Sequence, residues 1–161
     1  MMKRTNILNE LYKVNTVNTE ETNFQSILEI ISSESNSNNN FNFNKLDKNR
    51  IFDLDSIKKI CIDFRLRFLD SKYFKNSLPK EAFSEIAKLE SDHNTILSDF
   101  KIMAPSKLFR LKNTDDPLLF VPLGNNYFYL VHKWGNDLHP CRKLLMWPLK
   151  SLWNMIGFLL F

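Results

Sequence analysis

Glycine and cysteine are both scarce in this sequence. Its 161 residues contain three glycines, each isolated from the others, so no glycine-rich loop of the kind that cradles a phosphate can form. The two cysteines, Cys61 and Cys141, lie 80 residues apart. A lone, distant pair favours two free thiols in a reducing compartment over a disulfide.

A secretory signal is also missing from the N-terminal residues. The opening stretch, MMKRTNILNELYKVNTVN, is basic but has no apolar run of the length that a signal peptide requires, and no small-residue cleavage site. We therefore expect most of the chain to be cytoplasmic.

Apolar periodicity is absent between residues 33 and 46. This tract consists mainly of Ser and Asn, and such a composition cannot bury enough surface to offset the entropy of the chain. The sequence predicts a disordered linker over 33–46. The preceding residues 1–32 are predicted to be a weakly helical N-terminal segment, in which Phe24, Ile27 and Ile31 share one helical face.

Two stronger helical patterns follow the polar tract. Apolar residues recur with helical spacing after Asp53 and Asp55, either of which can cap the helix, and this predicts a helix over 54–71. Pro79 suits a first helical turn, and the apolar residues after it predict a second helix over 79–93.

The next part of the chain reads as β-structure. Residues 117–122 and 127–134 are apolar, aromatic-rich runs, and the Gly124, Asn125 and Asn126 between them tolerate positive φ. This is the pattern of an antiparallel hairpin. Because Pro117 and Pro122 cannot donate to a ladder, we expect the first run to be an edge strand.

The order of these elements predicts the fold class. Helices come first, then strands joined by short turns, and this favours an α+β domain over 47–143 with a small antiparallel sheet. We expect a hydrophobic C-terminal helix over 144–161 to follow it.

Polar side chains that could hold a metal ion occur near the hairpin. Asp116, His132, Asp137 and His139 are of the right type, and His139 lies two residues from Cys141. Their spacing matches no established zinc motif, however, and Pro140 interrupts it. We expect that these four side chains do not share one site, and we assign no catalytic residue and no cofactor.

The C-terminal part carries the excess positive charge and the longest apolar run. Residues 101–161 contain eight basic and three acidic groups, a net charge of +5. Basic residues beside an apolar run favour an anionic lipid surface as partner. The expected membrane-contacting residues are Arg142, Lys143, Trp147, Lys150, Trp153, Ile156, Phe158 and Leu159.

The apolar run itself admits three interpretations. It could be the start of a membrane span, a helix lying in the plane of the membrane, or a helix packed on the sheet. Apolarity increases towards the last residue, basic residues precede it, and Trp147 and Trp153 suit interface depth. We therefore expect the start of a membrane anchor, although the run as it stands is too short to cross a bilayer.

Part of the chain resembles a known group of proteins. The strings KIMAPSKLF, DDPLLF and HKWGNDL lie within residues 48–150, and this stretch resembles a family of uncharacterised flavobacterial proteins. In that family a cytoplasmic domain precedes hydrophobic C-terminal segments. The resemblance implies a membrane-associated protein and does not imply any activity.

Together these patterns predict a membrane-tethered binding or scaffolding module of unknown ligand. Its location is expected to be the cytoplasmic face of the inner membrane, or alternatively the cytoplasm. Membrane lipid is the expected partner, a further protein partner is left open, and nucleic acid is disfavoured because aromatic and basic residues also alternate in any half-buried sheet. The alternative is a metal-dependent enzyme using Asp116, His132, Asp137 and His139.

Overall fold

An antiparallel sheet of five strands lies at the centre of the computed structural model, which describes residues 4–15, 21–33, 38–106 and 117–159. The strand order is β1-β5-β4-β3-β2, and each neighbouring pair is antiparallel. The predicted α+β fold is therefore confirmed. The strands are β1 Ile51–Asp53, β2 Leu66–Asp70, β3 Lys101–Pro105, β4 Leu118–Gly124 and β5 Tyr127–Lys133. The helices are α1 Ile7–Val14, α2 Glu21–Ser33, α3 Leu54–Phe64, α4 Lys80–His93, α5 Arg142–Met146 and α6 Leu152–Leu159. Short 3₁₀ turns are η2 Phe43–Lys45, η3 Lys48–Arg50, η4 Ser71–Tyr73 and η6 Trp147–Lys150.

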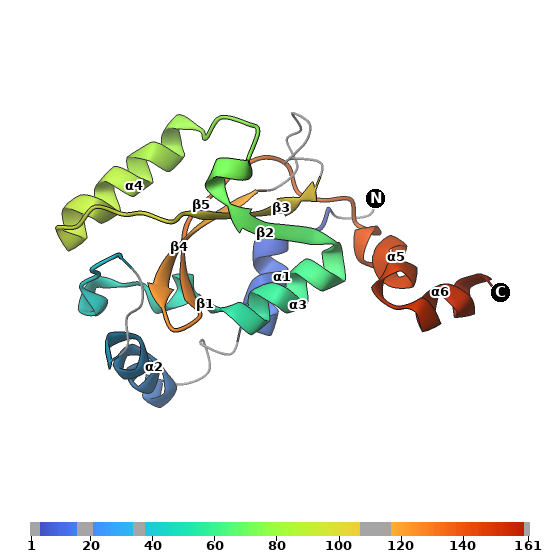
Figure 1. The fold of residues 1–161 in the computed structure, drawn as a ribbon, viewed down its shortest axis with the longest axis horizontal. Helices are drawn as coiled ribbons and strands as arrows, with labels where there is room; N and C mark the ends of the chain where they lie inside the picture. Colours follow the sequence, from blue (N-terminus) through green and yellow to red (C-terminus); the bar gives the residue numbers. More distant parts are fainter. Residues whose placement is uncertain (1–3, 16–20, 34–37, 107–116, 160–161) are drawn as a thin grey trace.

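The sheet is covered by helices on both faces (Figure 1). Side chains alternate along the central strands, so that Leu119 and Val121 of β4 enter one hydrophobic cluster while Leu118 and Phe120 enter the other. Helices α1 and α3 contribute to the second cluster, and α2 and α4 to the first. The N-terminal helices thus belong to the same core as the sheet.

The predicted hairpin is confirmed. Strands β4 and β5 pair from Leu118↔Lys133 to Gly124↔Tyr127. Asn125 and Asn126 form the turn with φ of 48° and 64°, and two successive positive φ values are what a turn matched to the strand twist needs.

The expectation that β4 is an edge strand is wrong, because β4 lies between β5 and β3. Strand β3 pairs only with the Leu118–Phe120 part of β4, and the ladder to β5 is irregular between Pro122 and Gly124. Pro122 therefore lies at a bulge, where a missing N–H is tolerated even inside a sheet.

The helix predicted over 54–71 ends earlier than expected. Asp53 is its N-cap and accepts a hydrogen bond from the Ser56 N–H at 2.7 Å. The helix stops at Phe64 because Arg65 adopts a left-handed conformation (φ 51°, ψ 56°). The next five residues form β2, which pairs along its whole length with β3. The second predicted helix, 79–93, is confirmed as α4 with Pro79 as its N-cap residue.

The prediction of disorder does not hold for residues 38–46; residues 34–37 lie outside the described part. Phe41 and Leu46 are buried in the core. The Asn39 amide nitrogen donates to the carbonyls of Ser98 and Pro122, both at 3.1 Å, and its oxygen accepts from the Ser98 N–H at 2.7 Å. The composition predicted a solvated tract, but the buried Asn39 amide has backbone partners in place of water.

The expected single C-terminal helix is also wrong. Pro148 lies in η6, and Ser151 is extended, with φ −152° and ψ 149°. Proline removes a helical hydrogen bond and clashes with the preceding turn, so the segment divides into α5, η6 and α6. Within the described ranges no helix is both long enough and apolar enough to cross a membrane.

Candidate functional site

The C-terminal end of α3 is where the segment 142–150 attaches to the domain. Arg142 donates from Nε to the Phe64 carbonyl at 2.7 Å and from Nη2 to the Arg65 carbonyl at 3.3 Å. The last carbonyls of a helix have no partner within it and carry the negative end of its dipole. A guanidinium at this position therefore fixes α5 to the end of α3.

A second attachment uses a carboxylate that is nearly buried. The Asp63 side chain is 10 % exposed and forms ion pairs with Lys150 and with Lys143, whose Nζ lies 3.6 Å from Oδ2. Burial alone would raise the pKa of Asp63, but the hydrogen bond from Lys150 and the charges of Lys150 and Lys143 together lower it. Asp63 is thus an anion that holds η6 and α5 against α3.

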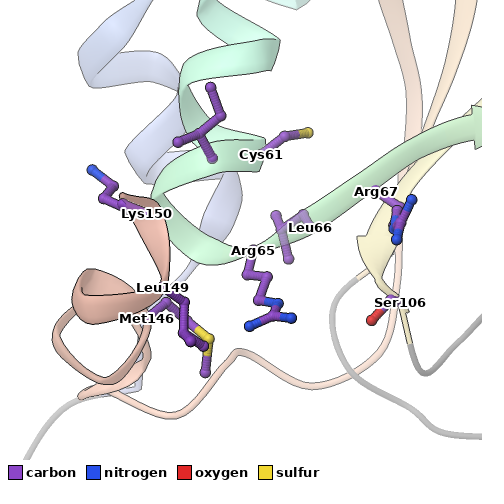
Figure 2. Close-up of a pocket in the computed structure, with 9 residues that line it drawn as sticks. Cys61, Arg65, Leu66, Arg67, Ser106, Met146, Leu149 and Lys150 are labelled. Atoms are coloured by element: carbon purple, nitrogen blue, oxygen red, sulfur yellow. The ribbon is translucent and has the colours of Figure 1, made fainter. Parts of the chain in front are cut away.

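An open groove of about 460 Å³ lies between the α3–β2 junction and η6 (Figure 2). Its volume is within the range of small-molecule sites. Three cationic side chains, Arg65, Arg67 and Lys150, line it, and none of the described lining residues is acidic. The remaining lining residues are Cys61, Ile62, Leu66, Ser106, Met146 and Leu149.

Cys61, a described lining residue of the groove, is not an activated nucleophile. Burial raises the pKa of the Cys61 thiol to about 12, and the protonated thiol is a poor nucleophile. Cys61 therefore acts as a small apolar wall residue. The described lining of the groove, cationic and apolar, is suited to binding an anion with an apolar part.

Large apolar side chains are exposed along the same C-terminal segment. Leu144 is 74 % exposed and Leu159 is 75 % exposed. Figure 1 shows α5 and α6 at one end of the molecule, beyond the sheet. The exposed large apolar residues of this segment are Leu144, Leu145, Trp147, Leu149, Met155, Ile156 and Leu159.

The structure divides the expected membrane-contacting residues into three groups. Trp147, Ile156 and Leu159 are exposed and could reach a partner. Arg142, Lys143 and Lys150 contact α3, so part of their charge is used inside the protein. The side chains of Trp153 and Phe158 lie outside what the structure describes.

The proposed metal ligands are held by other partners. His132 stacks on Trp134 with ring centroids 6.1 Å apart. Asp137 pairs with Lys133 at 2.9 Å. His139 accepts a hydrogen bond from the Cys141 N–H at 3.2 Å through Nδ1.

The fourth candidate ligand, Asp116, lies outside the described residues. Over the part of the chain that is described, no three His, Cys, Asp or Glu side chains gather where they could hold a metal ion. The enzyme alternative therefore gains no supporting observation from these side chains.

Sequence reasoning missed the two arginines of the groove. The helix predicted over 54–71 includes both Arg65 and Arg67, so the sequence did not indicate that the chain leaves the helix between them. The alternation of Leu66, Arg67 and Phe68 was the available signal, since it places Arg67 on the side of a strand opposite to the two apolar residues.

Comparison of the chain with protein-family models, with curated proteins and with solved structures gives no match. The resemblance to the flavobacterial proteins therefore stays a prediction.

Proposed function

We propose that the protein is a membrane-tethered binding or scaffolding module that docks through residues 142–159 onto the cytoplasmic face of the inner membrane. The observation that carries this proposal is the concentration of exposed large apolar side chains over residues 144–159. Soluble surfaces rarely expose apolar residues in such density unless they meet a partner or a membrane.

Charge supports lipid as the partner. Arg65, Arg67 and Lys143 are near the apolar segment, and each has an exposed side chain. Basic residues at an anionic leaflet contribute about 1 kcal/mol each. Apolar side chains that enter the interface contribute in addition, in proportion to the area they remove from water.

The proposed contact of the described residues is with the interfacial layer of the membrane. Helix α6 has eight residues, which corresponds to a length of about 12 Å, well below the roughly 30 Å of a bilayer core. The apolar residues of α5, η6 and α6 would therefore enter the interfacial layer, while the sheet and its helices stay outside it and present their surface to other partners.

Vesicle binding of the full chain tests the proposal. The double variant Leu144→Ser/Leu145→Ser removes two exposed leucines and should weaken binding about thirty-fold, because roughly 2 kcal/mol of apolar transfer is lost. The variant Ile96→Ser is the matched control, since Ile96 is 84 % exposed and lies after α4. Co-sedimentation with vesicles measures both.

The expected result is that Ile96→Ser binds like the unmodified chain. Equal losses in the two variants, or an unmodified chain that stays in the supernatant with every vesicle, would contradict the proposal.

A further inference from the structure

Arg65 and Arg67 both line the groove. They flank Leu66, whose side chain is buried, and both are exposed. Arg65 reaches the groove from the left-handed residue that ends α3, and Arg67 reaches it from β2. Figure 2 shows Arg65 between Met146 and Leu149 on one side and Arg67 and Ser106 on the other.

These two guanidinium groups are available to a ligand. Within the described residues neither of them forms an ion pair, whereas Lys150 in the same groove is paired with Asp63. The charge of Asp63 is shared between Lys143 and Lys150, so the groove keeps an excess of positive charge. Guanidinium binds phosphate with two parallel hydrogen bonds, and a pair of them is a strong phosphate site.

The other wall of the groove is apolar. Ile62 is 60 % exposed and Leu149 is 54 % exposed, and Met146 lies beside them. A free phosphate ion would leave this wall in water. A ligand that joins a phosphate to a hydrocarbon chain would cover both halves of the groove.

We infer that the groove binds the headgroup of an anionic phospholipid, with Arg65 and Arg67 on the phosphate and the Met146–Leu149 wall against the upper part of an acyl chain. The inference rests on the proposed function and names its ligand. The groove would bind one class of lipid specifically, whereas the exposed leucines would bind any bilayer.

The location of the groove agrees with this assignment. Leu149 lines the groove and is also one of the exposed apolar residues of the C-terminal segment. A protein docked through that segment would therefore have the groove at headgroup depth, with no further movement of the domain.

The experiment compares binding of the full chain to phosphatidylcholine vesicles and to the same vesicles containing phosphatidylglycerol. The unmodified chain should prefer the anionic vesicles. The variant Arg65→Asn/Arg67→Gln should lose about thirty-fold in affinity for them and little for the neutral ones. Asn is used at position 65 because it tolerates the left-handed conformation found there.

Two matched variants distinguish specific phosphate binding in the groove from nonspecific attraction between a positive protein and an anionic membrane. Lys80→Gln/Lys88→Gln removes the same charge from α4, which packs on the other face of the sheet from α3, and should bind as the unmodified chain does. Arg65→Lys/Arg67→Lys keeps the charge but loses the planar fork, and should still lose about ten-fold.

Four outcomes overturn the inference: no preference of the unmodified chain for anionic vesicles, an equal loss in the α4 variant, full affinity in the lysine variant, and inorganic phosphate binding as tightly as the anionic vesicles. If the leucine variant still loses binding to both kinds of vesicle, the proposed function stands without the headgroup site. If the unmodified chain binds neither, both are rejected.

Discussion

Replacing Asn39 with Ala removes the hydrogen bonds by which its side chain joins the segment 38–46 to the rest of the fold. Two are donated to the carbonyls of Ser98 and Pro122, both at 3.1 Å. Two are accepted, from the Ser98 N–H at 2.7 Å and from the Ser98 hydroxyl at 3.5 Å. Asn39 is only 2 % exposed, so water cannot readily replace the lost amide. At about 1 kcal/mol for each of the three bonds with backbone partners, the variant should lose about 3 kcal/mol of unfolding free energy.

Equilibrium unfolding in urea, followed by far-UV circular dichroism, measures this loss. A loss of this size should lower the midpoint by about 1–2 M, because domains of this size have slopes of roughly 1–3 kcal/mol/M. The control is Asn38→Ala, the same change one residue earlier. Asn38 is exposed and reaches Asp99 at 3.3 Å, so its variant should stay within about 0.5 kcal/mol of the unmodified chain.

Equal midpoints for the two variants would refute the reasoning. The segment 38–46 would then be solvated in solution, as its composition suggests, and the hydrogen bonds of Asn39 would contribute nothing to stability. A change in slope with the midpoint unaltered would instead indicate that the variant acts on the unfolded ensemble.

Two further predictions concern the C-terminal end of α3. The pKa of Asp63 is lowered, so its ion pairs contribute their full stability above the ordinary carboxyl pKa of about 3.9, and this stability is lost as the pH falls through the lower folded-state pKa. Asp63→Asn should therefore cost about 1–2 kcal/mol of unfolding free energy at neutral pH and make the stability, measured by chemical unfolding, fall less steeply at acid pH. An unchanged acid dependence would contradict the assignment. Burial raises the pKa of Cys61 from 9.0 to about 12, so at neutral pH its alkylation should be about a thousand-fold slower than that of a free cysteine. Mass spectrometry of iodoacetamide-treated protein measures this rate, and labelling at the rate of a free cysteine would contradict the burial of the thiol.

The left-handed conformation of Arg65 connects stability with the groove. A non-glycine residue in this region costs roughly 1–2 kcal/mol, and a glycine would be the ordinary choice at the end of a helix. Arg65 holds this position between α3 and β2 while its carbonyl accepts from Arg142 and its side chain lines the groove. The strain is located where the domain, the C-terminal segment and the proposed lipid site meet.

Some elements followed from the sequence because neighbouring residues decide them. Two asparagines between apolar runs are enough to predict the β4–β5 turn, since the tolerance for positive φ depends on the type of residue alone. The cap at Asp53 and the start of α4 after Pro79 are local in the same way. The apolar period of α2 also held, with Ile27 and Ile31 buried.

Residues 66–70 show what local pattern leaves undecided. Their apolar residues fit the end of a helix as well as a strand, and the full-length pairing of β2 with β3 selects the strand. The position of β4 is also decided by strand pairing. A proline is excluded from a regular ladder, but Pro122 lies at a bulge, and a bulge can occur in a central strand.

The sequence by itself determined the α+β class, the hairpin, and the concentration of apolar and basic residues near the C-terminus. Only the tertiary structure decided that Asn39 is buried against Ser98, that Asp63 pairs with Lys150, and that Arg65 and Arg67 share a groove. The physical reason is distance along the chain. A turn or a cap depends on a few adjacent residues, whereas a buried amide, an ion pair or a groove depends on partners that only folding brings together.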